Sequence, residues 1–139
     1  MELRVMRPLL FIFASCAFAA AASATPLYVG TQEGCNRGIV TTDPNLRGCS
    51  TVPYGNTGPQ RYSVIALFSG LTAGVNEGLV STYPDFLGGR TRFIGYSVLN
   101  GDPTKRLHSG GTEGCNFGYV TNDPEFLGCD TSDIGYANF

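Results

Sequence analysis

An all-β fold built from three closed repeats is what this sequence predicts. Equivalent residue types recur along the chain at a spacing of 40 residues. The 19 glycines, together with short β-branched and aromatic runs, favour short strands joined by tight turns. No segment keeps a helical hydrophobic period over a window of about 11 residues. These observations favour an all-β body with pseudo-three-fold symmetry.

The repeat is defined by sets of three residues that recur without a gap. The sets include Cys35, Val75 and Cys115; Cys49, Gly89 and Cys129; Pro44, Pro84 and Pro124; Leu27, Leu67 and Leu107; and Asn36, Asn76 and Asn116. So many coincidences at one spacing indicate an internal duplication. The units run over 27–66, 67–106 and 107–139, and the third is shorter than the others.

Each unit begins with a predicted strand, which covers Leu27–Gly30 in the first unit. A second strand is expected at Gly38–Thr42, bounded by glycine and polar turn residues. A third follows the second cysteine position and is clearest at Thr91–Leu99. The run Tyr62–Phe68, rich in β-branched and aromatic residues, leads into the next unit.

A single helical turn is predicted between the second and third strands. Asp43 and Asp123 each precede a proline, which places a good N-cap before a good first helical residue. A glycine five residues after each aspartate can end the turn. Tyr83 replaces the aspartate in the middle unit, so this turn is expected to fray or to pack the aromatic ring instead.

Closure of the three units follows from their number. Three units are too few for a capped solenoid or for an ordinary propeller. A β-trefoil fits best, because the strand at Leu27 can supply the piece that the shorter third unit lacks. A β-prism, which is also three-fold, is the alternative.

Residues 1–24 have the pattern of a secretory signal peptide. Arg4 and Arg7 precede an apolar run, and the small residues Ala22-Ser23-Ala24 form an Ala-x-Ala cleavage site. The apolar run is shorter than the ~20 residues of a membrane-spanning helix. We therefore expect a secreted or periplasmic protein whose residues 25–139 form one domain.

A lipid anchor at Cys16 is the alternative localisation, because residues 13–16 resemble a lipobox, although Phe13 stands where an aliphatic residue is usual.

The remaining four cysteines allow three disulfide pairings. The middle unit has lost both of its cysteine positions together, which is expected if the two cysteines of one unit bond to each other. This favours Cys35 with Cys49 and Cys115 with Cys129; a cross-connection between the first and third units stays open. Zinc binding is disfavoured, because there is no Cys-x-x-Cys element and the expected compartment is oxidising.

Charge and catalytic residues narrow the classes of function. The net charge of −2 offers no basic surface for nucleic acid. His108 is the only histidine, and it occupies the repeat position of Tyr28 and Phe68, which favours a half-buried ring on a strand. The segment 109–114 is rich in glycine but lacks the lysine of a phosphate-binding loop. We therefore expect no enzyme, no cofactor and no metal.

Several short motifs resemble a known type of repeat. Leu27-Tyr28, the segment Val40-Thr41-Thr42-Asp43-Pro44 and the pair Gly95-Tyr96 resemble the short tandem repeats of unknown function, of the DUF5648 type, found in bacterial secreted proteins. The chain departs from them at Asn36-Arg37-Gly38, where such repeats usually have Asp-His-Phe. The resemblance implies an extracytoplasmic accessory module that binds cell walls or glycans, and it brings no functional residues.

Glycan binding is the favoured function, because sugars need aromatic rings for their apolar faces and Asn or Asp side chains for their hydroxyls. The candidate ligand-binding residues are Asn36, Asp43, Asn76, Tyr83, Tyr96, Asn116, Asp123 and Tyr136. They predict a non-enzymatic module with up to three related sites, for carbohydrate or cell-wall polysaccharide. The alternatives are an inhibitor or effector that binds another secreted protein, and a structural envelope component.

Overall fold

The structure is a computed structural model that describes residues 24–59 and 65–138. The predicted signal peptide, apart from Ala24, and the alternative anchor at Cys16 lie outside the described residues. Residues 62–64 of the predicted run Tyr62–Phe68 also lie outside the described residues, and Ala66 to Phe68 belong to a strand.

Nine strands and four short 3₁₀ turns make up the described chain, which is therefore all-β as predicted. The strands are β1 (Pro26–Gly30), β2 (Val40–Thr41), β3 (Thr51–Asn56), β4 (Ala66–Gly70), β5 (Val80–Ser81), β6 (Thr91–Tyr96), β7 (Arg106–Gly110), β8 (Val120–Thr121) and β9 (Thr131–Tyr136). The 3₁₀ turns cover Leu46–Gly48, Phe86–Gly88, Pro103–Lys105 and Phe126–Gly128. The predicted second strand, Gly38–Thr42, is only two residues long, because Gly38 lies in a turn, Ile39 in an isolated bridge and Thr42 in a bend.

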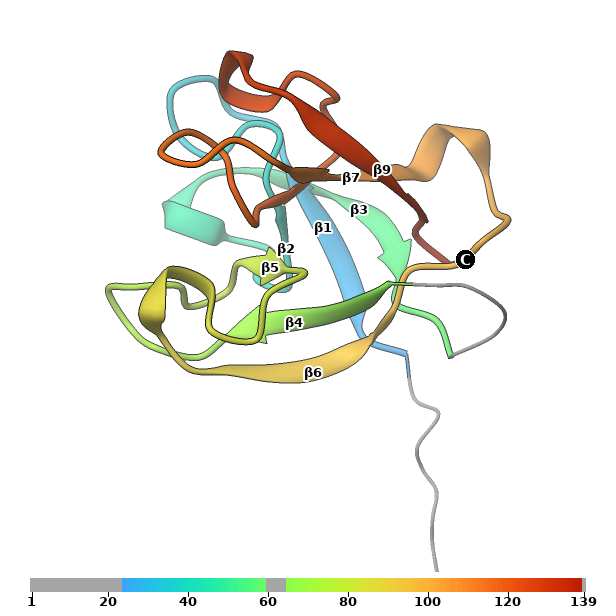
Figure 1. The fold of residues 1–139 in the computed structure, drawn as a ribbon, viewed down its shortest axis with the longest axis horizontal. Coiled ribbons are helices and arrows are strands. Elements are labelled where there is room, and N and C mark those ends of the chain that lie inside the picture. The colour runs from blue at the N-terminus through green and yellow to red at the C-terminus, as the bar shows by residue number, and fades with distance from the viewer. Residues whose placement is uncertain (1–23, 60–64, 139) are drawn as a thin grey trace, which may run out of the picture.

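Each repeat forms one antiparallel sheet of three strands, with the first strand of the repeat in the middle. In Figure 1 the longer strands of each sheet run beside each other, β1 with β3, β4 with β6, and β7 with β9. The register is the same in every sheet. A β-bulge falls at the same place in each, directly after the leucine that recurs in the first strand of every repeat. The repeated units predicted from the 40-residue spacing are therefore confirmed.

Isolated bridges join each sheet to the next. At one end of the strands Thr41 pairs with Leu79, Ser81 with Tyr119, and Thr121 with Ile39. At the other end Gly58 pairs with Tyr96, Val98 with Tyr136, and Asn138 with Asn56. Both sets run from the first unit to the second, from the second to the third, and from the third back to the first. The three sheets thus form an arrangement compatible with three-fold repetition.

The core has two layers, each built from equivalent residues. The central layer contains the three buried leucines of the first strands and the three buried valines of the second: Leu27, Leu67, Leu107, Val40, Val80 and Val120. The second layer contains Ile39, Leu46, Leu79, Phe86 and Phe126, with Tyr119 packed against them. Each unit contributes one side chain at every equivalent position of the two layers. The apolar side chains of one unit are therefore covered by those of the other two, and no unit could bury its apolar face alone.

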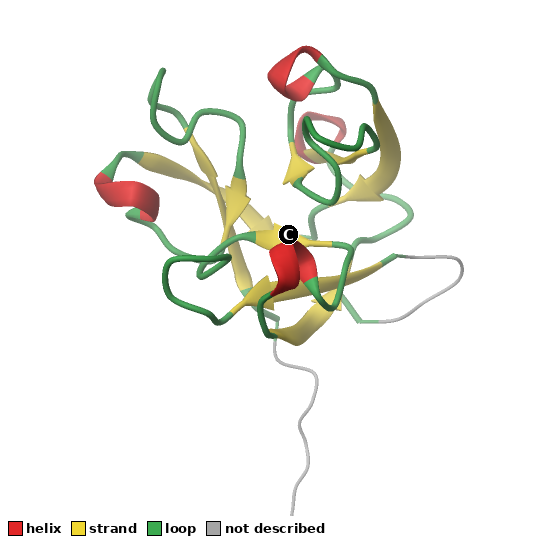
Figure 2. Cartoon of the chain, turned by 60° about the vertical axis from the view of Figure 1, so that its left-hand side comes forward, coloured by secondary structure: helices red, strands yellow, loops and turns green. Residues whose placement is uncertain are grey.

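The helical turn before the third strand occurs in all three units, as Figure 2 shows in red. It begins later than predicted, at Leu46 rather than at Pro44. Asp43 still caps the loop, because its Oδ1 accepts a hydrogen bond from the Asn45 N–H at 2.9 Å. The middle unit keeps the turn without this aspartate. Fraying is therefore the wrong outcome, and packing of Tyr83 is the right one.

Two disulfides staple the outer units. Cys35 is bonded to Cys49 and Cys115 to Cys129, as the loss of both positions in the middle unit predicted. Two structural disulfides indicate an oxidising compartment. In residues 24–59 and 65–138 no helix has the length and apolar character needed to cross a membrane.

Candidate functional site

The three repeated asparagines are buried, and this corrects their predicted role. Asn36, Asn76 and Asn116 expose at most 1% of their surface. The Asn36 amide donates to the carbonyl oxygens of Leu46 at 3.0 Å and Ser50 at 3.1 Å, and its Oδ1 accepts from the Gln32 N–H at 3.1 Å. These side chains form hydrogen bonds with buried backbone groups, as buried polar groups generally do. They are therefore structural residues and do not belong to the candidate ligand site.

The two predicted aspartates lie in clefts between neighbouring units. Asp123 of the third unit faces the first unit across a cleft of about 950 Å³. Its Oδ1 accepts a hydrogen bond from the Glu125 N–H at 2.9 Å, which fixes the carboxylate against the turn. Its Oδ2 accepts no hydrogen bond from the described residues. One carboxylate oxygen therefore shapes the loop, and the other is available to a ligand.

Charged groups from the first unit line the other side of this cleft. Arg37 and Glu33, which are four residues apart in the sequence, form an ion pair, and both side chains are largely exposed. An exposed pair of this kind adds little to stability. The guanidinium has five N–H donors, of which this pair uses one, so the cleft offers donors as well as carboxylate acceptors.

The same cleft has an apolar wall. Val52 and Leu127, which line it, are 46% and 61% exposed. Tyr54 lies beside them with its ring buried, and the Lys105 ammonium sits 5.1 Å from the ring centroid. Donors, acceptors and exposed aliphatic surface therefore meet in one place, which is the composition of a site for a small polar ligand with an apolar face.

A second cleft, of about 340 Å³, lies at the boundary of the first and second units. Asp43 occupies the position of Asp123, and Glu77 occupies the position of Arg37. Arg92 and Leu71 also line it. This cleft is smaller than the first, and at the equivalent positions it has two carboxylates, Asp43 and Glu77, rather than the carboxylate and guanidinium of Asp123 and Arg37.

The third boundary, between the second and third units, is occupied by aromatic rings. Tyr83 stands where the other boundaries have Asp43 and Asp123, and its ring packs edge-on against Phe117 with 5.2 Å between centroids. Phe117 is the counterpart of Arg37. The structure thus brings together an acid and its facing residue at two boundaries, and a ring pair at the third.

The two remaining predicted residues, Tyr96 and Tyr136, lie at the opposite end of the strands. The Tyr96 ring packs against Phe93 with 5.1 Å between centroids. Tyr136 packs under the Arg106 guanidinium, whose carbon is 4.5 Å from the ring centroid. Neither tyrosine lines the clefts that contain the aspartates, so the eight predicted residues do not form one site.

His108 is half-buried on β7, as its repeat position predicted. Burial lowers the pKa of its imidazole, and the Asp133 carboxylate opposes this shift. Within the described part of the chain, no three His, Cys, Asp or Glu side chains are grouped as metal ligands would be.

Sequence reasoning missed Arg37, Glu33 and Leu127 as cleft residues. Arg37 belongs to the Asn-Arg-Gly segment, in which only the asparagine was singled out. The signal that could have found it is the variation within the repeat: position 37 changes to Glu77 and Phe117, while the flanking Asn and Gly recur unchanged.

No protein-family model matches this chain, and neither the curated proteins nor the solved structures include a significant match.

Proposed function

We propose that the protein is a secreted, non-enzymatic binding module for carbohydrate, with its main site in the cleft between the third and first units. One observation carries the proposal: Asp123, Arg37 and an exposed aliphatic wall face one cavity of about 950 Å³. A pyranose presents hydroxyl groups that both donate and accept, and a C–H face that packs on apolar surface. The signal-peptide pattern and the two disulfides support the secreted location.

A β-trefoil-like closure is the version of the fold that we propose, with a β-prism as the alternative. The bridges that return from the third unit to the first, at both ends of the strands, support it. The resemblance to short repeats of bacterial secreted proteins also supports the proposal of a module that binds cell walls or glycans.

The first test is binding of the oxidised protein, collected from the secreted fraction, to a glycan array and to insoluble polysaccharides. Asp123→Asn and Arg37→Gln are expected to weaken binding about tenfold, because each removes a hydrogen bond to a charged group. Asp85→Asn is the matched control, since that exposed carboxylate makes no capping hydrogen bond to the 3₁₀ turn that follows it and lines neither cleft. A folded, oxidised protein that binds no glycan would overturn the proposal.

A gain-of-function variant tests the same proposal from the opposite direction. Tyr83→Asp combined with Phe117→Arg gives the third boundary the charged residues of the first cleft. We expect calorimetry to count one additional sugar site. An unchanged number of sites in a correctly folded variant would mean that these two positions do not define the site.

A protein partner is the second candidate function, favoured by where the exposed apolar side chains lie. Among the described residues, seven of the nine exposed large hydrophobic side chains fall between Ile65 and Leu99: Ile65, Leu71, Val75, Tyr83, Leu87, Phe93 and Leu99. These side chains share one stretch of the chain, and we propose that this stretch presents them to a partner, because a contiguous exposed apolar patch is typical of a protein interaction surface. Capture of a secreted protein that is lost with Phe93→Ser, while glycan binding is absent, would favour this function.

A further inference from the structure

A third cavity lies at the opposite end of the strands from the two aspartate clefts. It has a volume of about 400 Å³ and lies between the end of the second unit and the sheet of the third. The third sheet lines it with Arg106, Asp133 and Tyr136, and Ile65 and Leu99 form the apolar part. None of these residues lines the two clefts described above.

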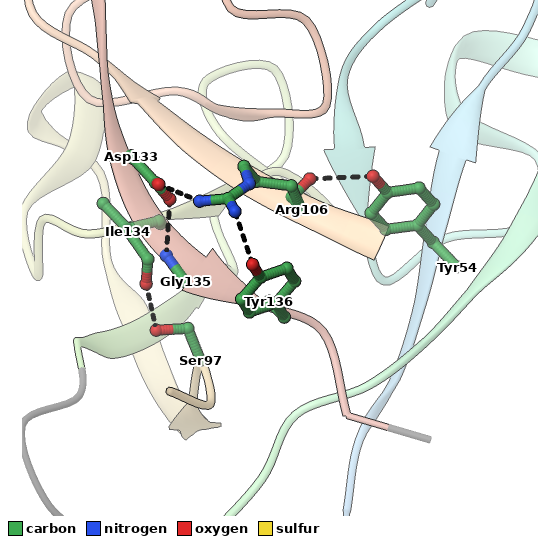
Figure 3. A network of polar contacts seen from close by, with 7 residues as sticks. All are labelled: Tyr54, Ser97, Arg106, Asp133, Ile134, Gly135 and Tyr136. Atoms are coloured by element: carbon green, nitrogen blue, oxygen red, sulfur yellow. Dashed lines mark hydrogen bonds and ion pairs between the residues drawn. The ribbon is translucent and has the colours of Figure 1, made fainter. Parts of the chain in front are cut away.

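The Arg106 guanidinium is held on two sides. Its Nη1 is paired with the Asp133 carboxylate, and its Nη2 donates to the Tyr136 hydroxyl. Figure 3 shows both contacts, and the guanidinium carbon lies 4.5 Å from the centroid of the Tyr136 ring. Two of its five N–H donors are used by these contacts, so further donors face the cavity with no partner among the described residues.

Residues from all three units fix this arrangement, as Figure 3 shows. The Tyr54 hydroxyl of the first unit donates to the Arg106 carbonyl oxygen at 2.7 Å. Burial raises the pKa of this phenol, which is already protonated at neutral pH with its ordinary pKa of about 10. The Ser97 hydroxyl of the second unit donates to the Ile134 carbonyl oxygen at 2.6 Å. A site held in this way loses little entropy when a ligand binds.

The fold does not require these side chains, and the repeat itself is the control. The positions of Arg106, Asp133 and Tyr136 are taken by Pro26, Pro53 and Asn56 in the sheet of β1 and β3, and by Ala66, Phe93 and Tyr96 in the sheet of β4 and β6. All three sheets nevertheless have the same register and bulge. The Arg106 and Asp133 side chains are 40% and 50% exposed, and an ion pair in such surroundings contributes little to stability. Arg106 and Asp133 therefore occur in one sheet only for a reason other than stability, and binding of a ligand is such a reason.

We infer that this cavity is a second carbohydrate subsite, in which Arg106 and Asp133 bind neighbouring hydroxyls of a neutral sugar. The inference rests on the proposed function. The paired charges cancel, which disfavours an anionic ligand beside the Asp133 carboxylate. The pair presents guanidinium donors and carboxylate oxygens within one contact, as a diol needs. Ile65 and Leu99, 40% and 48% exposed, supply the apolar surface for the sugar ring.

The test is a nuclear magnetic resonance titration of the oxidised, secreted protein with named probes. The probes are neutral hexasaccharides of glucose, mannose and N-acetylglucosamine, with a galacturonic acid hexasaccharide as the anionic comparison. We expect a neutral probe to shift the Arg106 Nε–Hε signal and the Gly135 amide. Arg106→Gln and Asp133→Asn should each weaken this response about tenfold. Arg90→Gln, an exposed arginine of the middle unit, should leave it unchanged.

The outcomes separate this inference from the proposed function. Shifts around Asp123 without shifts at Arg106 and Gly135 would overturn the second subsite and leave the first intact. A response to the galacturonic acid probe alone would overturn the neutral class of ligand. No response at either place would overturn both. Because the titration of the unaltered protein decides these cases, a variant that fails to fold does not affect the result.

Discussion

The two outer units each contain a disulfide and the middle unit contains none, yet all three units have the same backbone arrangement. The outer units carry disulfides, whereas the middle unit has Val75 and Gly89 at the cysteine positions. All three sheets keep the same strand order, register and bulge. The disulfides therefore stabilise the fold without defining it, and the features common to all units must define it.

The strongest common feature is a close contact between a glycine and the buried asparagine. A Cβ atom built on the glycine that ends the first strand would lie only about 2 Å from the carbonyl oxygen of the asparagine. The values are 2.0 Å for Gly30 and Asn36, 2.0 Å for Gly70 and Asn76, and 1.9 Å for Gly110 and Asn116. No other residue type fits there, and the middle unit has this contact as fully as the outer units.

The largest effect is predicted for Gly70→Ala in the unit without a disulfide. The new methyl group would meet backbone, so strand or loop must move, at a cost of about 3 kcal/mol or more in the free energy of unfolding. Gly111→Ala is the control, because its Cβ would meet only the Asp130 carbonyl oxygen at 3.8 Å. Urea denaturation measures both. Equal stability of the two variants would contradict the role assigned to the glycine contact.

The next effect is predicted for removal of the Cys35–Cys49 disulfide by paired replacement with alanine. The closed loop has about 15 residues, so the loss is expected to be about 3 kcal/mol. If the middle unit shows how a unit folds without its disulfide, β1 and β3 will keep their hydrogen-exchange protection under native conditions. Loss of protection confined to the first unit would show that its disulfide, unlike the glycine contact, is needed for its fold.

A smaller gain is predicted for a third disulfide, made by Val75→Cys with Gly89→Cys. A Cβ at position 89 would lie 2.8 Å from the Asn76 side-chain nitrogen, so the amide must shift. We therefore expect a gain of about 1–2 kcal/mol rather than the full loop-closure value. Thermal unfolding with and without reductant measures it. A gain equal to the loss in the first unit would mean that the amide moves at no cost.

The smallest effect is predicted for pH, through His108. Because burial lowers the pKa of the folded imidazole, the unfolded chain binds the proton more tightly. Stability is then complete above the unfolded value of about 6.5 and is lost as the pH falls through it towards the folded value. A proton titration by nuclear magnetic resonance should give a midpoint below 6.5. His108→Phe, which copies Phe68 of the middle unit, should remove this part of the pH dependence.

The repeat made several features predictable from particular residues. Simultaneous loss of both cysteine positions at 75 and 89 gave the disulfide pairing, because one partner is not retained without the other. The asparagines were misassigned for a physical reason. An asparagine two residues before a glycine is typical of an exposed turn. Nothing nearby in the sequence distinguishes it from one that bonds to carbonyl oxygens 10 and 14 residues later, as Asn36 does.

The sequence by itself determined the strand content, the three units and the crosslinks, because these depend on local patterns and on a fixed spacing. The tertiary structure alone decided which side chains face one another across unit boundaries. Tyr83 meets Phe117, and Asp123 shares a cleft with Arg37, only because each unit packs against the next and the third packs against the first. Such contacts join residues far apart in the chain, so no local pattern encodes them.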